Sequence, residues 1–201
     1  MKILLATKNI HKVQEITDIL HDYMDGIVSL NEFPGLPDPV EDGATFYENS
    51  LKKAMHYYRL TGLSTLADDS GLIIDALGGE PGIYSARYID PALTFPERSR
   101  IILERLKEVP LEKRGARFCC CCVIVWSADK IITETGYVEG KIGYEMKGNY
   151  GFGYDPIFLL PERGLHLAEV PPEEKNKISH RAKALEKIKL HLDGLKWRAK
   201  F

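Results

Sequence analysis

The spacing of hydrophobic residues in the first part of the chain predicts a strand, a helix and two further strands. Residues 2–6 form a short apolar run that is typical of a buried strand. After a short turn, the helical spacing of Val13, Ile16 and Ile19 predicts a helix. We expect a strand over residues 64–67 that leads into the sequence Asp-Asp-Ser-Gly, and a further strand over residues 72–77.

Two T-x-x-E sequences predict where further helices begin. In such a capping box the Thr side chain accepts a hydrogen bond from the helix, and the Glu side chain reaches back to the cap residue. Thr45 with Glu48 and Thr94 with Glu97 fit this pattern, and we expect the second of these helices to extend to about residue 109. The last helix is predicted from apolar residues three or four positions apart: Ile178, Ala182, Leu185, Ile188 and Leu192.

Two long apolar segments in the middle of the chain complete the predicted sheet. They cover about residues 116–127 and 131–139, and their weak alternation favours strands buried on both faces. Strands and helices mix without a strict βαβ order, so we predict an α/β fold with a mixed sheet. The length of 201 residues corresponds to about one domain, with room for an added lobe.

The composition excludes several classes of protein. The chain has 27 Lys and Arg against 29 Asp and Glu, and this net charge of −2 argues against a dedicated nucleic-acid-binding protein. Its longest apolar run, residues 118–126, is far shorter than the roughly 20 residues of a membrane-spanning helix. The N-terminal apolar stretch is broken by Lys8, too early for a signal peptide, so we expect a cytoplasmic protein.

The four cysteines are consecutive, from Cys119 to Cys122. A disulfide framework would distribute them along the chain. In a strand, neighbouring side chains point to opposite faces, so the four thiols cannot converge on one metal ion. We therefore interpret them as small buried residues of a core strand, with a redox or metal role as the alternative.

A polar turn follows the first predicted strand and opens the first helix. The backbone N–H groups at a helix N-terminus favour anions, and the side chains here add hydrogen-bond donors and two positive charges, as a phosphate site requires. It is not a Walker A loop. The alternative is that the asparagine only caps the helix and that the lysines are solvated. The candidate residues are Thr7, Lys8, Asn9, Ile10, His11 and Lys12.

Acidic residues at two places form a candidate magnesium site. Asp68 and Asp69 follow an apolar strand, where carboxylates are costly unless they are solvated, paired or bound to a cation. Mg²⁺ commonly takes one or two carboxylates together with substrate phosphates. Glu41 is a candidate second carboxylate, and Lys53 a candidate phosphate-binding lysine. A D-x-S-G turn and ordinary helix salt bridges are the alternatives.

Two segments near the C-terminus carry residues suited to bind a nucleotide base. In residues 151–156, the glycines allow close approach of a ligand and Phe152 offers a flat face for stacking. His180 and Arg181 lie at a helix start, which is unfavourable for positive charge unless an anion or a carbonyl group binds there. The alternatives are an aromatic-rich turn and a solvated helix start.

Six segments together resemble the inosine triphosphate pyrophosphatase family, in its bacterial dITP/XTP form. They occur in the family's order, and the resemblance runs from about residue 3 to residue 190. The chain departs from the family at Lys8, where glycine is frequent, and in its run of cysteines. The matching segments cover residues 7–12, 45–54, 67–72, 77–88, 151–156 and 175–181.

The resemblance implies a single domain over residues 1–201, with a long mixed sheet, two lobes and a central nucleotide cleft. It implies a Mg²⁺-dependent homodimer that hydrolyses deaminated purine nucleoside triphosphates to the monophosphate and pyrophosphate.

The resemblance also implies roles for the candidate residues. Residues 7–12 and Lys53 would hold the triphosphate, Asp69 would be the general base and a metal ligand with Glu41, and Ser70 would contact the substrate. The residues implied around the base are Phe152, Gly153, Tyr154, Asp155, Lys175, His180 and Arg181.

Two other functions remain open at this point. One is an enzyme of the same design that acts on another target, such as a modified pyrimidine triphosphate. The other is a regulatory module that binds a nucleotide without hydrolysing it. The joint presence of Asp68, Asp69, Lys12 and Lys53 argues against the second, because binding alone does not require the carboxylates.

Overall fold

The computed structural model describes residues 2–198, with side chains through residue 194. These residues form two compact units. The first unit comprises the described residues up to Asp69, Cys120–Gly136 and the described residues from His180, and the second comprises Ser70–Cys119 and Tyr137–Ser179. Within residues 2–198, no helix is both long and apolar enough to cross a membrane.

Seven strands form one mixed sheet, in the order β2-β1-β3-β4-β5-β6-β7. Strand β1 pairs in parallel with β2 and β3, whereas β6 pairs antiparallel with β5 and β7. The predicted α/β fold with a mixed sheet is therefore confirmed. The strands are β1 (Lys2–Leu5), β2 (Gly26–Ser29), β3 (Thr65–Ile74), β4 (Gly115–Ser127), β5 (Lys130–Ile142), β6 (Phe158–Leu160) and β7 (Leu165–His166).

The helices begin where the capping residues predict. Thr45 caps α2, and Thr94 with Glu97 forms a complete capping box at α3. Helix α3 ends at Arg105, earlier than predicted, because the chain turns at Leu106. The predicted last helix is two helices, because Ser179 is extended between them. The helices are α1 (Ile10–Leu20), α2 (Phe46–Thr61), α3 (Phe95–Arg105), α4 (Pro172–Ile178) and α5 (His180–Arg198).

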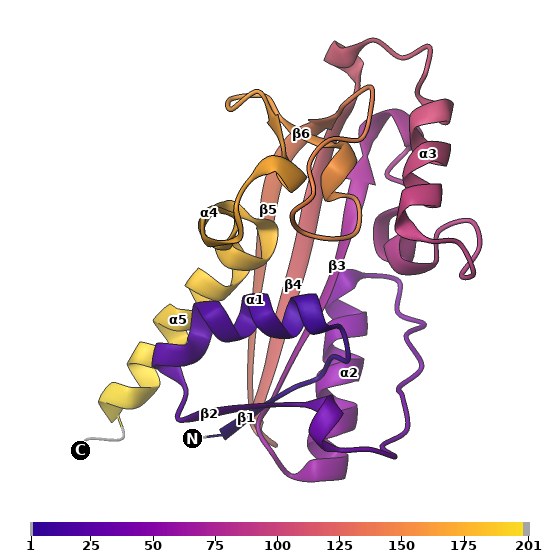
Figure 1. The fold of residues 1–201 in the computed structure, drawn as a ribbon. Helices are drawn as coiled ribbons and strands as arrows, with labels where there is room; N and C mark the ends of the chain where they lie inside the picture. Colours follow the sequence, from indigo (N-terminus) through magenta and orange to yellow (C-terminus); the bar gives the residue numbers. More distant parts are fainter. Residues whose placement is uncertain (1, 199–201) are drawn as a thin grey trace. The chain divides into compact units, whose positions relative to one another are not determined.

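The strands of the first unit carry helices on both faces (Figure 1). Residues Ile3, Leu5 and Leu66 pack on one face against α1 and α5. Leu4 and Ala67 pack on the other face against α2. This alternation along β3 directs the two residues after Ala67 to different sides of the sheet.

The cysteines follow the same alternation along β4. Cys120 and Cys122 join the cluster under α1 and α5, whereas Cys121 joins the cluster under α2. All four cysteines are buried, and none of them forms a disulfide. The interpretation as small core residues of a strand is confirmed.

The sequence prediction for β3 was wrong at its centre. A single strand, Thr65–Ile74, runs through the Asp-Asp-Ser-Gly segment, where the sequence analysis places a break between two strands. The alternation of the strand continues through Asp68 and Asp69, so the carboxylates lie within a strand rather than at its end.

The two long central strands differ in burial. Strand β4 is buried on both faces from Phe118 to Val125, as predicted. Strand β5 instead alternates between buried and exposed residues, so the prediction of two buried faces was wrong for it. Strand β6 pairs with β5 only at Lys141 and Ile142, so most of β5 has no strand on its β6 side among the described residues.

Gly136 allows α5 to begin directly beside β5. A Cβ atom at this position would lie 2.2 Å from the carbonyl oxygen of His180. Any larger residue would displace the start of α5, which carries His180 and Arg181.

The second unit has its own core. The ends of β3, β4 and β5 pack with β6 and α3 around Phe118, Ile142 and Phe158. Rings of Phe118 and Phe158 lie 4.7 Å apart between centroids. This core supports the segment that carries Phe152 and Asp155.

Candidate active site

The turn before α1 is organised by Asn9. Its side chain accepts hydrogen bonds from the backbone N–H groups of His11 and Lys12, at 3.0 and 3.3 Å. The Thr7 hydroxyl accepts one from Asn9 N at 3.2 Å. Asn9 therefore caps the helix, and the positive charge of this turn comes from the Lys8 and Lys12 side chains. Ile10 and His11 are exposed.

A cavity of about 150 Å³ lies against this turn. Four of its lining residues were predicted from the sequence: Thr7, Lys8, Glu41 and Lys53. Lys8 is paired with Asp38 at 2.6 Å, but both side chains are more than half exposed, so the pair is screened by water.

Asp68 is the centre of a buried cluster of positive charge. Its Oδ2 atom lies 2.9 Å from both Lys12 Nζ and Arg181 Nη2. Lys53 Nζ donates to the Asp68 backbone carbonyl oxygen at 3.2 Å and lies 3.1 Å from Glu41 Oε2. Burial alone would raise the pKa of Asp68, but Lys12, Arg181 and Lys53 hold it well below its usual range.

The pKa of Asp69 is shifted in the opposite direction to that of Asp68. The Oδ2 atom of Asp69 accepts a hydrogen bond from Asn49 Nδ2 at 3.1 Å. Burial raises the pKa of Asp69, and Glu41 raises it further, although Lys53, Lys12 and Asn49 act against this shift. Two adjacent aspartates thus have pKa values shifted in opposite directions, a pattern typical of catalytic carboxylates.

The donor set of this corner fits a hard divalent cation. Asp69 and Glu41 offer carboxylate oxygens, and the Glu41 carboxylate raises the pKa of Asp69. The Oδ1 atom of Asp68 is buried without a hydrogen-bond partner among the described residues. No group of three or more His, Cys, Asp or Glu side chains in residues 2–198 is arranged to hold a metal. Mg²⁺ commonly needs only one or two carboxylates, with the remaining positions filled by phosphates and water.

A second cluster of predicted residues lies in the second unit. Lys175 Nζ and Asp155 Oδ2 form a buried ion pair at 2.6 Å. Asp155 Oδ2 also accepts from Phe152 N at 2.9 Å, and Lys175 Nζ lies 4.7 Å from the centroid of the Phe152 ring. Gly151 makes this arrangement possible, because it has a φ of +71° and a Cβ there would lie 2.1 Å from Asp155 Oδ2.

The other predicted residues are placed as follows. Tyr154 is buried in the core of the second unit, where its hydroxyl donates to Ser85 O at 2.9 Å. Gly153 has a φ of +69°, Ser70 is half-buried in β3, and His180 is buried at the start of α5.

The structure adds two residues that the sequence analysis did not select. Glu15, on α1, forms an ion pair with Arg181, whose side chain is almost fully buried. Asn49, on α2, contacts Asp69 and also accepts from Gly43 N at 2.8 Å. Glu15 follows Lys12 by three positions, so helical spacing places it on the same side of α1.

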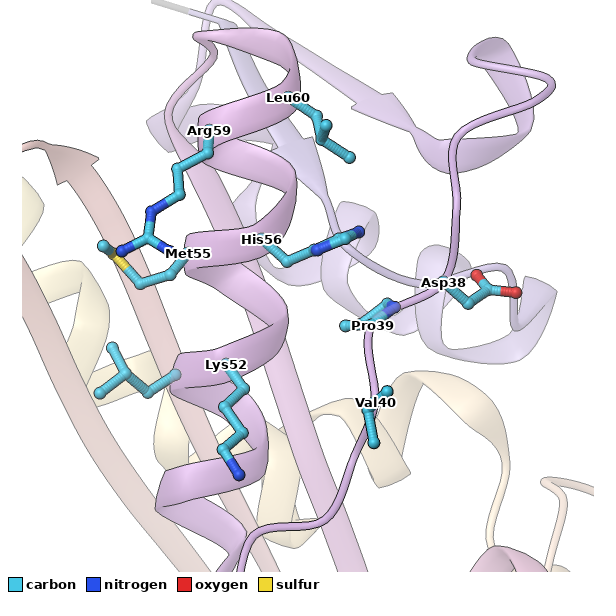
Figure 2. A pocket seen from close by; sticks show the side chains of 9 residues that line it. Asp38, Pro39, Val40, Lys52, Met55, His56, Arg59 and Leu60 are labelled. Carbon is cyan, nitrogen blue, oxygen red and sulfur yellow. The ribbon is translucent and has the colours of Figure 1, made fainter.

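A larger cavity, of about 620 Å³, lies along α2 in the first unit. Figure 2 shows Lys52, Met55 and His56 on the helix, with Pro39 and Val40 on the segment opposite. This cavity is lined by none of the residues predicted from the sequence to bind substrate or metal.

The chain is similar to curated proteins and to solved structures over nearly its whole length. A dITP/XTP pyrophosphatase from Geobacter sulfurreducens is 44% identical over 191 residues, covering 95% of this chain and 96% of the relative. One from Dictyoglomus thermophilum is 47% identical over 195 residues, covering 96% and 94%. The solved structure of a HAM1 protein from Coxiella burnetii has a TM-score of 0.87 at 40% identity, covering 96% and 99%.

A further solved structure and a family model agree with these relatives. The structure of a nucleoside-triphosphatase / dITP/XTP pyrophosphatase from Mycobacterium abscessus has a TM-score of 0.74 at 37% identity, covering 94% of this chain and 98% of that one. The resemblance predicted from six sequence segments is thereby confirmed. Because the model of the Ham1 family matches residues 3–191, nearly the whole chain, this protein belongs to the Ham1 family.

Proposed function

We propose that this protein hydrolyses deaminated purine nucleoside triphosphates, namely ITP, dITP and XTP, to the monophosphate and pyrophosphate. The observation that carries the proposal is the pair Asp68 and Asp69, whose pKa values are shifted in opposite directions beside Lys12 and Lys53. The names of the curated relatives agree with this reaction. The reaction would remove damaged precursors from the nucleotide pool.

Asp69 is proposed as the general base. Its raised pKa makes it a better proton acceptor than an ordinary aspartate. A water molecule that gives its proton to Asp69 attacks the α-phosphorus, and the bond from that phosphorus to the bridging oxygen of the β-phosphate breaks. Pyrophosphate leaves with the electron pair of that bond.

The lysines stabilise the negative charge that develops on the leaving pyrophosphate. Thr7, Lys8, Asn9, Ile10, His11 and Lys12 are proposed to hold the triphosphate, with Lys53 as a further catalytic cation. Preorganised positive charge of this kind is often the largest contribution to catalysis. Asp69 and Glu41 are proposed to hold Mg²⁺, which supplies additional positive charge to the phosphates when bound.

Base selection follows from hydrogen-bond chemistry. Hypoxanthine and xanthine carry an acceptor oxygen at position 6, where adenine carries a donor amine. Lys175 is a donor, so an adenine amine would face a group that it cannot pair with, and unpaired polar groups discriminate strongly. Arg181, the other donor expected near the base, is buried and donates to Asp68 and Glu15. We propose that Ser70, Phe152, Gly153, Tyr154, Asp155 and His180 complete the substrate contacts.

The remaining proposals concern the whole protein. We propose that residues 1–201 act as one pyrophosphatase domain, that the protein forms a homodimer, and that it works in the cytoplasm. Its substrate is a small nucleotide, without a nucleic acid or membrane partner.

A turnover panel with Mg²⁺ tests the proposed function. ITP, dITP, XTP, ATP, GTP, CTP and UTP are each incubated with the protein, and pyrophosphate is measured separately from orthophosphate. The proposal expects pyrophosphate from the first three and little from the others. Orthophosphate as the direct product would contradict the site of attack, and equal efficiency on ATP and ITP would contradict the base selection. Recovery of bound nucleotide intact would indicate a binding module instead.

A further inference from the structure

Four charged residues of the first unit form a continuous series of ion pairs, in which Asp68 and Arg181 are fully buried and Lys12 and Glu15 are partly buried. Lys12 pairs with Asp68, Asp68 pairs with Arg181, and Arg181 pairs with Glu15. Lys12 and Glu15 both belong to α1, while Asp68 lies on β3 and Arg181 on α5. The chain of contacts therefore starts and ends on the helix whose N-terminal turn is proposed to hold the triphosphate.

Arg181 is fixed from two sides. Its Nε and Nη2 atoms donate to Asp68 Oδ2 at 3.3 and 2.9 Å, and its Nη1 atom donates to Glu15 Oε2. Burial alone would lower the pKa of Arg181, but Asp68 and Glu15 hold it well above its ordinary value. A planar guanidinium held by two carboxylates has little freedom to rotate.

The restraint on Arg181 decides how the oxygens of the Asp68 carboxylate are shared. Its Oδ2 atom is shared by Arg181 and Lys12, while Oδ1 is buried without a hydrogen-bond partner among the described residues. An Arg181 freed on its Glu15 side can turn toward Asp68 and form a bidentate pair with both oxygens, which is the preferred geometry for Arg and carboxylate. Such a pair would compete with Lys12 for Oδ2.

We propose that Glu15 is a positioning residue for the triphosphate-binding turn, which acts through Arg181 and Asp68 to keep Lys12 in place. This inference rests on the proposed function, because it assigns Lys12 to the triphosphate. In this proposal Glu15 acts through Arg181 and is assigned no contact with the substrate or the reacting atoms.

Removal of the Glu15 charge changes triphosphate binding in opposite directions, depending on whether Glu15 acts by positioning Lys12 or by its charge alone. The Glu15 carboxylate is negative and repels the triphosphate, so removal of its charge would by Coulomb's law strengthen phosphate binding. Loss of a positioning contact has the opposite effect, since small displacements of a substrate-binding group reduce rates strongly. A variant that loses the charge and binds phosphate more weakly is explained by positioning alone.

The test compares Glu15→Gln and Glu15→Asp with a matched control, Asp18→Asn. Asp18 is an exposed carboxylate on the same helix, so its change removes the same charge without touching the chain of ion pairs. For each protein we measure kcat/KM on ITP and ATP, the Kd of inorganic triphosphate by calorimetry, and the thermal unfolding midpoint.

We expect Glu15→Gln to lower kcat/KM by about tenfold or more on both nucleotides, with the ratio between them unchanged. The Kd of inorganic triphosphate should rise by about tenfold, and Asp18→Asn should behave like the unmodified protein. Glu15→Asp should show the same losses, because it keeps the charge but withdraws the carboxylate by one methylene.

Several results would overturn the inference. These are an unchanged or improved Kd of triphosphate in Glu15→Gln, normal kinetics in Glu15→Asp, or a loss confined to the preference for ITP over ATP. The last result would mean that Glu15 serves the base instead. Turnover of ITP by the unmodified protein tests the proposed function separately, because the triphosphate Kd requires no turnover.

Discussion

Among the described residues, each compact unit contains an ion pair between a buried aspartate and a lysine, and the two pairs differ in their surroundings. Asp68 and Lys12 lie 2.9 Å apart in the first unit, and Asp155 and Lys175 lie 2.6 Å apart in the second. Asp155 is also satisfied by the Phe152 backbone, so its pair forms a closed local structure. Asp68 instead shares its charge with several cations and has an ionisable neighbour, Asp69.

The difference teaches what makes a buried ion pair reactive. In the second unit the charges satisfy each other and hold Phe152 and Lys175 in place, which suits recognition of a ligand. In the first unit an excess of positive charge keeps Asp68 ionised, while burial raises the pKa of Asp69. Chemistry is therefore expected at the first pair and specificity at the second.

The largest effect should come from Asp69→Asn. This change removes the proposed general base but keeps the size of the side chain and a hydrogen-bond acceptor for Asn49. We expect turnover of ITP to fall by about a thousandfold, within the usual contribution of a general base. Circular dichroism and thermal unfolding should show an intact fold. A variant that keeps most of its pyrophosphate release would remove Asp69 from this role.

Asp68→Asn should affect stability as well as activity. It leaves Lys12 and Arg181 buried without their shared carboxylate, and loss of one partner from a buried pair typically costs about 3–5 kcal/mol. We expect a lower free energy of unfolding in urea at pH 7. The matched change Asp75→Asn removes an exposed pair with Arg117 and should have little effect.

The pH dependence of that stability loss follows from the direction of the pKa shift. The pKa of Asp68 is lower in the folded than in the unfolded protein, so its stabilising effect is present wherever the unfolded aspartate is ionised. The difference between the two proteins should stay constant from pH 7 to pH 5 and shrink below about pH 4. A difference that grows on acidification would contradict the assignment.

Lys175→Met should change specificity more than chemistry. It removes the donor proposed for the 6-oxo group of the base, while Asp155 still accepts from Phe152 N. We expect the preference for ITP over ATP to fall by about tenfold, the scale of one hydrogen bond to a charged group. Lys12→Met is the variant to compare with it, because loss of Lys12 should reduce the turnover of ITP and ATP by the same factor. Equal losses in Lys175→Met would remove the distinction between the two pairs.

Lys8→Gly should have the smallest effect. Lys8 is more than half exposed and is paired with an exposed Asp38, and such pairs contribute little. We expect kcat/KM on ITP to change by less than about threefold. A tenfold loss would mean that the Lys8 side chain contributes as much to holding the triphosphate as a buried lysine does, and would contradict the small contribution expected from its exposed position.

The sequence predicts the elements well because their signals are local. Apolar spacing and the Thr45 and Thr94 caps indicate most helices, and the burial of the cysteines follows from their place in an apolar run. The continuity of β3 could not be predicted, because acidic and glycine residues are typical of turns and the cations that pair with Asp68 come from distant parts of the chain. The exposed face of β5 depends on what packs over that face, which the local sequence does not contain.

In the candidate site, too, the sequence indicates residues in local motifs but not the contacts between distant parts of the chain. The six motifs contain Lys12, Lys53 and Asp69, whereas Glu41 lies outside them, and the structure brings these four residues together around Asp68. The motifs do not include Glu15, and its contact could not be predicted because its partner, Arg181, is 166 positions away in the sequence. Long-range ion pairs of this kind become visible only when the chain is folded.

The central claim is that the corner around Asp68 and Asp69 directs water to the α-phosphorus. The most direct test is hydrolysis of ITP in ¹⁸O-labelled water, followed by mass spectrometry of both products. Attack at the α-phosphorus, as proposed, places the label in IMP and leaves the pyrophosphate unlabelled. Label in pyrophosphate or in orthophosphate would mean attack at another phosphorus and would contradict the account.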